Sequence, residues 1–174
     1  MTIRDIDPEA LATSTHEAMR AKAAELAASC GVPDFPLSTS PSRVRMAVHQ
    51  LATYATSGHP PEGRSELIAE YIGDVYEVAT ALDELLPGSA ALDTDLGVVI
   101  HAASARDALD RGDPVSRVQL AALGGVSLGR IGQLVTAGQL PRPEVGQDAR
   151  QRLWDAGVAK AWLAGRGVGG PGQL

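Results

Sequence analysis

The sequence predicts a mainly α-helical protein, in which four helices are followed by two short helices, a pair of strands and a last helix. Apolar side chains recur every three or four residues in the first four segments, and Gly, Pro and Ser separate these segments. The charge also changes sign along the chain. Residues 1–114 hold 8 Lys and Arg against 18 Asp and Glu, whereas residues 115–174 hold 7 against 3.

These observations divide the chain into three parts. Gly112, Asp113 and Pro114 form a turn where the charge changes, so we predict an acidic helical domain at 1–113 and a basic module at 114–165. Residues 166–174 are mostly glycine, a composition that buries too little surface to order itself, and are expected to be a flexible tail.

Four helices are expected in the acidic part. They span Pro8 to Cys30, Pro41 to about Thr56 with Ser40 as N-cap, Arg64 to Leu86, and Asp93 to Arg111. Each has an apolar stripe that we expect to face a shared core: Leu11, Thr15, Met19, Ala23, Leu26 and Cys30; Val44, Val48, Leu51 and Tyr54 or Ala55; Ile68, Tyr71, Val75, Val78, Leu82 and Leu85; and Leu96, Val99, Ile100, Ala103 and Leu109.

The third stripe has heptad spacing and allows two interpretations. It covers only about two and a half heptads, and Leu67, Ile72 and Leu86 widen it beyond a two-stranded seam. A buried bundle helix is therefore favoured over a dimer seam. The acidic part is assigned to homodimerisation or to binding a protein partner.

Composition excludes several classes of function. The single cysteine, Cys30, builds neither an internal disulfide nor a thiolate zinc site, and it suits a reducing cytoplasm. The four histidines, His16, His49, His59 and His101, lack ligand-like spacing, so we expect no metal. Phosphate-loop and nucleophile-elbow motifs are absent from the sequence, which predicts a protein that is not an enzyme and needs no cofactor. No apolar run is long enough to cross a membrane.

The basic module begins with two short helices. Ser116 and Gln119 fit a capping box that opens the first, and Gly124 and Gly125 end it. The second is expected to begin at Ser127 and end at Gly138. Its inward residues would be Ile131, Leu134 and Val135. Two short helices joined by a glycine-containing turn are typical of a helix-turn-helix.

A wing and a final helix complete the pattern. Leu140–Pro141 and Gln151–Trp154 are expected to pair as two strands around a polar loop from Arg142 to Arg150. Asp155 then caps a last helix, whose Trp162 can cover the open side of the helix pair. The expected fold is a small winged helix-turn-helix with a two-stranded wing, after a four-helix domain.

The residues of this module resemble the MerR-type and excisionase-type winged-helix family. The resemblance covers about fifty residues, within 114–165, and rests on these segments: Leu120-Ala-Ala-Leu-Gly-Gly-Val-Ser127, Arg130-Ile-Gly-Gln-Leu-Val-Thr-Ala-Gly138, Leu140-Pro141 and Arg152-Leu-Trp-Asp-Ala-Gly-Val-Ala-Lys-Ala-Trp-Leu163. It implies binding to double-stranded DNA, with the second helix in the major groove and the wing at the backbone or minor groove. The implied DNA-binding residues are Ser127, Leu128, Arg130, Gln133, Thr136, Arg142, Arg150 and Arg152.

The sequence departs from the family pattern at Gly129 and Gly132, where longer polar side chains are common. Either the glycines let the helix approach DNA closely, or base readout is weakened and the module acts through protein contacts. The first interpretation predicts a transcriptional regulator or a control factor of a phage or mobile element. The alternative is an antitoxin-like or adaptor subunit that acts through its acidic helical domain.

Overall fold

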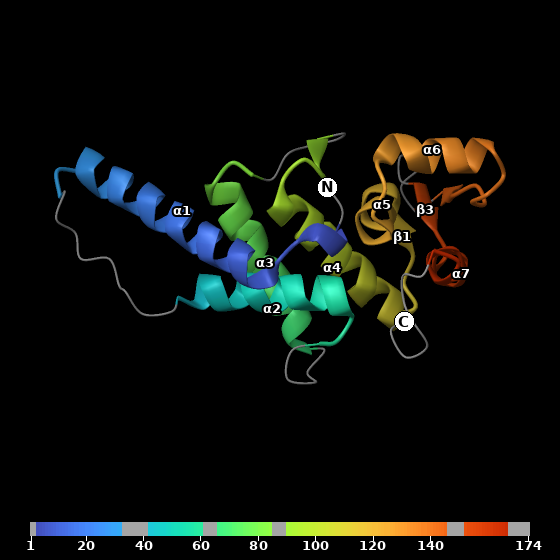
Figure 1. The fold of residues 1–174 in the computed structure, drawn as a ribbon, viewed down its shortest axis with the longest axis horizontal. Helices are drawn as coiled ribbons and strands as arrows, with labels where there is room; N and C mark the ends of the chain where they lie inside the picture. Colours follow the sequence, from blue (N-terminus) through green and yellow to red (C-terminus); the bar gives the residue numbers. More distant parts are fainter. Residues whose placement is uncertain (1–2, 33–41, 61–65, 85–89, 146–151, 167–174) are drawn as a thin grey trace.

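The computed structural model describes residues 3–32, 42–60, 66–84, 90–145 and 152–166, and over these ranges the protein is mainly helical with a small antiparallel sheet. The predicted helical class is confirmed. Helices α1 to α3 lie at one end of the molecule, α5 to α7 and the strands lie at the other, and α4 lies between them (Figure 1). The elements are η1 (Ile3–Asp5), α1 (Pro8–Ser29), α2 (Arg43–Ser57), α3 (Glu66–Ala81), α4 (Asp95–Arg111), β1 (Val115–Ser116), α5 (Arg117–Gly124), α6 (Leu128–Thr136), β2 (Glu144–Val145), β3 (Arg152–Trp154) and α7 (Ala156–Ala164).

Helix α4 is the central helix. Its neighbours are α2 and α3 on one side and α5 and α7 on the other. It is buried almost all round, as expected of a helix enclosed by others. The predicted stripe is confirmed in full, since Leu96, Val99, Ile100, Ala103 and Leu109 are all buried. One cluster of buried apolar residues runs from Ile3 through α4 to Leu163, so this helix contributes to the core of both parts of the chain.

A buried arginine on α4 ties it to the end of α2. Arg106 is only 4% exposed, and its Nε donates to the carbonyl oxygen of Ala55 at 3.0 Å while Nη2 donates to that of Thr56 at 3.4 Å. The last carbonyls of a helix have no partner within the helix and form its negative end. The guanidinium of Arg106 therefore caps α2 from the neighbouring helix.

Tyr54 lies beside this contact and makes stability depend on pH. Its hydroxyl donates to Oδ2 of Asp110 at 2.9 Å, and burial, followed by the carboxylate of Asp110, raises the pKa of Tyr54 well above its ordinary value near 10. The folded state thus favours neutral Tyr54. This preference stabilises the fold fully below pH 10 and is lost as pH rises, because the unfolded tyrosine ionises first.

We predict that the free energy of unfolding falls more steeply above pH 10 in the wild type than in Tyr54→Phe. The expected difference in slope is up to about 1.4 kcal/mol per pH unit. Urea unfolding between pH 8 and 11 measures it. If the free energy of unfolding falls with the same slope in both proteins, Tyr54 is not the source of this pH dependence.

The second half of α1 departs from the expected packing. Leu11 and Thr15 are buried as predicted, but Leu26 is 65% exposed and Cys30 is also exposed. The prediction that Leu26 and Cys30 face the core is wrong. Helix α1 continues past the beginning of α2, the helix on which it packs, so among the described residues no neighbouring helix covers its last turns (Figure 1).

Two helix ends also differ from prediction. The N-cap of α2 is Ser42, whose Oγ accepts from the backbone N–H of Arg45 at 3.2 Å, so Ser40 is not the cap; Ser40 and Pro41 lie outside the described residues. Helix α3 ends at Ala81, five residues before the predicted end, and Asp83 adopts a left-handed conformation with φ 57°. Leu85 and Leu86 lie outside the described residues.

Helix α3 packs as a bundle helix, with α2 and α4 as its neighbours. Ile68, Val75 and Val78 of its predicted stripe are buried, and Tyr71 and Leu82 are partly buried against the core. The stripe therefore serves the core of this chain, which confirms the favoured interpretation of the heptad spacing.

The small sheet has the order β1-β3-β2, with both outer strands antiparallel to β3. Strand β3 lies within the predicted Gln151–Trp154 segment. Its hairpin partner is Glu144–Val145 and not Leu140–Pro141, because Leu140 is buried in the core and the carbonyl of Pro141 accepts from Nε1 of Trp154 at 2.8 Å. Strand β1, in which Val115 pairs with Trp154, is an addition to the predicted pair of strands.

Candidate nucleic-acid interface

Helices α5 and α6 meet at 101°, within the usual range for a helix-turn-helix. The predicted capping box opens α5: Oγ of Ser116 accepts from the N–H of Gln119 at 3.4 Å, and Oε1 of Gln119 accepts from the N–H of Ser116 at 2.8 Å. Gly125 ends α5 in a left-handed conformation, with φ 61°.

In the described residues no single helix is long and apolar enough to cross a membrane. Helices α5 and α6 reach that length and apolar character only when the two are counted together, across their bend.

Helix α6 has one buried face and one exposed polar face. Ile131 and Leu134 are 1% and 4% exposed and anchor it to the core. Ser127 is its N-cap, and its Oγ accepts from the N–H of Arg130 at 3.2 Å. Four of the candidate residues on α6 lie on its outer side, at least partly exposed: Ser127, Arg130, Gln133 and Thr136. Leu128 differs from these, because its side chain packs against the core.

Two hydrogen bonds order the exposed face of α6. Nη1 of Arg130 donates to Oε1 of Gln133 at 3.2 Å, joining two side chains one turn apart. The hydroxyl of Thr136 donates back to the carbonyl oxygen of Gly132 at 3.0 Å. The polar groups that α6 presents to solvent are therefore partly engaged with each other.

Arg117 is a further basic residue of this surface, beyond those expected from the sequence. It is the first residue of α5, and its Nη2 donates to the carbonyl oxygen of Leu128 at the start of α6. A Cβ atom at Gly132 would lie 3.2 Å from the same nitrogen, so the missing side chain leaves room for Arg117. The contact depends on the angle between α5 and α6, and no short-range pattern in the sequence predicts it.

Gly129 has a different environment from Gly132. The nearest atom to a Cβ at Gly129 would be Oγ of Ser127 at 3.9 Å, so the space outside this glycine is open. The missing side chain therefore has a different consequence at each position. At Gly132 it leaves room for Arg117, and at Gly129 it leaves the backbone of α6 accessible from solvent.

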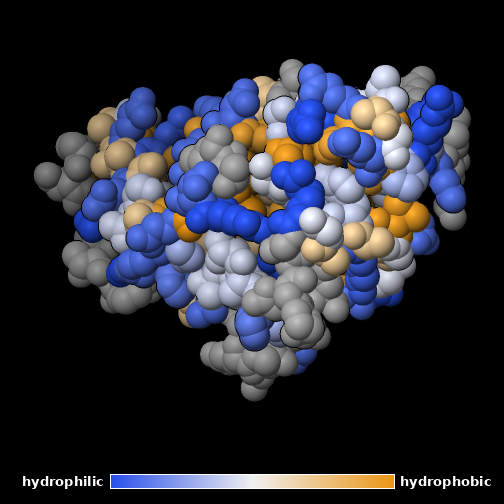
Figure 2. All heavy atoms as spheres, turned by 45° about the vertical axis from the view of Figure 1, so that its right-hand side comes forward, coloured by the Kyte–Doolittle hydropathy of each residue, from blue (hydrophilic) through white to orange (hydrophobic). Residues whose placement is uncertain are grey.

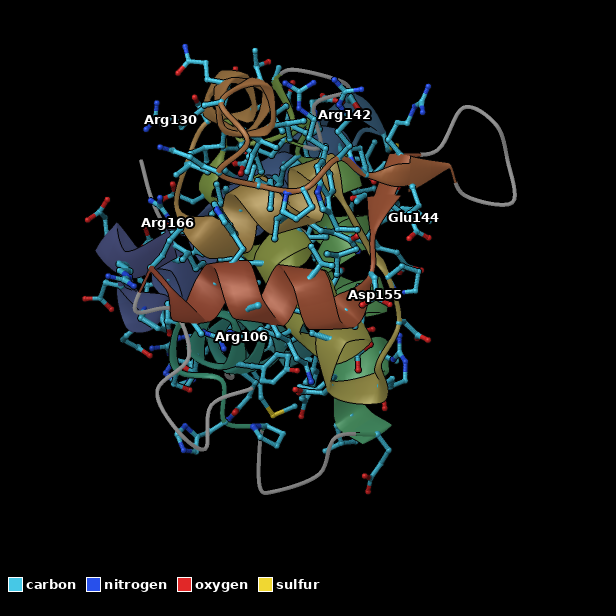
Figure 3. All side chains as sticks on the ribbon, turned by 90° about the vertical axis from the view of Figure 1, so that its right-hand side faces the viewer. Arg106, Arg130, Arg142, Glu144, Asp155 and Arg166 are labelled. Carbon is cyan, nitrogen blue, oxygen red and sulfur yellow. The ribbon has the colours of Figure 1, made fainter. Side chains whose placement is uncertain are left out.

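The remaining candidate residues lie on the wing side. Arg142 lies beyond α6, and Figure 3 shows it at the same edge of the molecule as α6 and Arg130. Arg152 is exposed on β3, opposite Val145 of β2. Arg150 lies outside the described residues. Arg166 is placed elsewhere, with its guanidinium 5.2 Å from the centre of the Trp162 ring beside α7.

Ion pairing distinguishes the two halves of the protein. In the acidic half, Arg43 pairs with Glu70 and Asp74, Arg45 with Glu9, and Arg111 with Asp107 and Asp113. In the described part of residues 115–166, no arginine or lysine pairs with a carboxylate. No carboxylate of the described residues therefore neutralises the exposed side chains of Arg130 and Arg152.

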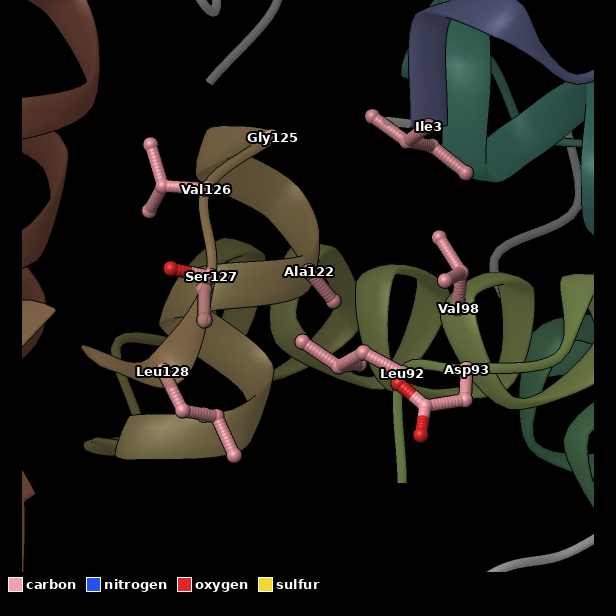
Figure 4. A pocket seen from close by; sticks show the side chains of 10 residues that line it. Ile3, Leu92, Asp93, Val98, Ala122, Gly125, Val126, Ser127 and Leu128 are labelled. Atoms are coloured by element: carbon pink, nitrogen blue, oxygen red, sulfur yellow. The ribbon is translucent and has the colours of Figure 1, made fainter. Parts of the chain in front are cut away.

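A hollow of about 310 Å³ lies where the acidic half meets the turn between α5 and α6 (Figure 4). Aliphatic side chains line it, from Leu92 and Val98 on one side and Val126 and Leu128 on the other, together with polar groups that include Ser127. Asp93 supplies a carboxylate at its edge. Among the described residues no group of three or more His, Cys, Asp or Glu side chains is placed to hold a metal ion. Residues of the acidic half and of the start of α6 therefore line the same hollow.

The visible face of the molecule mixes polar and apolar residues. Figure 2 shows hydrophilic residues along much of the right-hand edge, with an apolar patch close to that edge and further apolar atoms toward the middle. The exposed polar side chains of α6 and β3 are therefore mainly hydrogen-bond donors and cations that have no carboxylate partner within the described part of the chain.

No protein-family model, curated protein or solved structure matches this chain.

Proposed function

We propose that residues 114–165 form a winged helix-turn-helix that binds duplex DNA, and that the protein is a non-enzymatic regulator of transcription or a control factor of a phage or mobile element. The observation that carries this proposal is the exposed polar face of α6 among arginines that pair with no carboxylate in the described residues. Most protein–DNA contacts go to phosphates, and unpaired arginines suit that role.

The shape of α6 supports insertion into the major groove. The helix has nine residues, which makes it about 14 Å long, and the major groove of B-DNA admits a helix of this kind. Gly129 carries no side chain on the exposed face, so the helix backbone can approach DNA closely there. Arg152 is exposed on β3, in the hairpin with β2 that follows α6 in the sequence, and would contact phosphate from the wing.

The acidic half is placed so that its repulsion of DNA is limited. Helices α1 to α3 lie at the end of the molecule opposite α6 (Figure 1). Repulsion between the acidic side chains and phosphates falls off over about a Debye length, roughly 10 Å at moderate salt. A single module of this size buries little surface on DNA, so we propose that two copies bind together.

A second candidate function is a protein-interaction subunit that acts through its acidic half. One observation favours it: Leu26 and Val32, at the end of α1, are 65% and 51% exposed. Apolar side chains at a projecting helix end suit contact with another protein. In this alternative the C-terminal part contributes little binding energy to DNA.

Binding of the full chain to random duplexes of about 30 base pairs, followed by fluorescence anisotropy between roughly 50 and 200 mM salt, tests the first proposal. The logarithm of the association constant should fall linearly with the logarithm of salt concentration. Arg152→Ala should weaken binding to all sequences and lower the slope by about 1. Arg43→Ala removes the same charge from an ion-paired arginine and should leave the slope unchanged. Absence of binding at the lowest salt concentration would exclude this function.

A further inference from the structure

The beginning of α6 presents hydrogen-bond donors, and this limits the bases it can read. Arg130 is a donor at every nitrogen. Oγ of Ser127 already accepts from the N–H of Arg130, so Ser127 offers its hydroxyl hydrogen and one remaining lone pair. In the helix-turn-helix the first residues of the second helix contact the base edges, so these groups matter most.

Gln133 adds a second donor because of the way its amide group is turned. A glutamine reads adenine in a bidentate way only if its oxygen accepts from N6 while its NH2 group donates to N7. Oε1 of Gln133 accepts from Nη1 of Arg130 at 3.2 Å, which turns the oxygen toward Arg130 and the NH2 group away from it. Gln133 therefore offers a donor to the groove.

A hydroxyl acceptor lies at the far end of the helix. The hydroxyl hydrogen of Thr136 goes to the carbonyl of Gly132, so its oxygen remains as an acceptor. Thr136 is the last residue of α6, whereas Ser127 precedes its first. Gly129 and Gly132 offer no side-chain group between them.

We infer that α6 selects a guanine opposite Arg130 and a neighbouring keto base, guanine or thymine, opposite Gln133. Guanine N7 and O6 and thymine O4 are acceptors in the major groove, whereas adenine N6 and cytosine N4 are donors. A donor facing a donor leaves both groups unpaired in a desolvated interface, which costs binding energy. This inference rests on the proposed function, since it specifies what the same helix recognises.

In vitro selection of bound duplexes with the full-length protein tests the inference. The wild type should enrich a guanine next to a keto base. Arg130→Ala should lose the guanine and also free Oε1 of Gln133, so preference at the second position should change from a keto base to adenine by about tenfold. Gln133→Glu keeps an acceptor for Arg130 but removes the NH2 donor, so the guanine should persist while the second position changes to cytosine. The position altered by Gln133→Glu identifies the base that Gln133 contacts.

Gln139→Ala is the matched control, because Gln139 is exposed just beyond α6 and should leave the selected sequence unchanged. Adenine opposite Gln133 in the wild type, unaltered by Arg130→Ala, would overturn the inference. Tight, salt-dependent binding without any selected sequence would also overturn it, and would leave DNA binding itself intact. Absence of binding even at low salt would overturn both the inference and the proposed function.

Discussion

Replacing Arg106 with methionine is expected to lower the free energy of unfolding by about 3 kcal/mol. The substitution keeps much of the apolar length of the side chain but removes the donors that meet the carbonyls of Ala55 and Thr56. These acceptors lie at the end of α2, where buried carbonyls have no partner within the helix. Urea unfolding followed by circular dichroism measures the loss.

Arg111→Met is the matched control, since Arg111 lies on the same helix but its side chain is 56% exposed and its ion pairs are on the surface. Exposed ion pairs of this kind contribute at most about 1 kcal/mol. Amide hydrogen exchange should also increase at the end of α2 in Arg106→Met. If Arg106→Met and Arg111→Met destabilise the protein equally, the capping role of Arg106 is wrong.

Gly124→Ala is expected to destabilise the protein by about 2 kcal/mol, although alanine favours helix over glycine by about 1 kcal/mol. A Cβ atom at Gly124, the last residue of α5, would lie 2.6 Å and 2.7 Å from two ring carbons of Trp162. The ring is rigid and packs against the core, so it has to move as a unit. Thermal unfolding measures the loss, and a change in tryptophan fluorescence should report the displacement.

Gly129→Ala provides the comparison, because the same substitution there enters open space and should stabilise α6 by up to about 1 kcal/mol. The conflict with Trp162 can be isolated in a double-mutant cycle. In a Trp162→Leu background, Gly124→Ala should lose most of its cost. An equal cost in both backgrounds would show that the ring is not the cause.

The sequence predicts those features of the fold that depend on short segments. The apolar stripe of α4, the capping box at Ser116, the start of α6 at Ser127 and Asp155 as an N-cap are all confirmed. Each depends on residues within one or two turns of one another. The predicted burial of Leu26 and Cys30 is wrong because it depends on how far α2 extends beside α1, which no local pattern encodes. The strand predicted at Leu140 is wrong for a similar reason, since an apolar residue before a proline suits a strand as well as a core position.

In the candidate interface, too, the sequence predicts the local features and misses those that depend on the packing of separate elements. Helical periodicity places Arg130, Gln133 and Thr136 on one exposed face of α6, as predicted. The contact of Arg117 and the space it needs at Gly132 depend on the packing of α5 against α6, so a reading of α6 by itself misses them. The hydrogen bond between Arg130 and Gln133 is also a property of the folded helix, and it changes which base the glutamine can read.

Because α4 lies at the centre of the molecule, it limits where the chain can be cut and fused to another protein. The charge boundary lies at Pro114, yet α5 packs on α4, which ends before that point. A fusion that begins at Pro114 would separate α5 from this neighbour and expose apolar surface to water, with the aggregation that such surfaces promote. The smallest unit that can be moved to another protein is therefore α4 together with everything that follows it. Helices α1 to α3 can be exchanged only for a partner that fits the remaining side of α4.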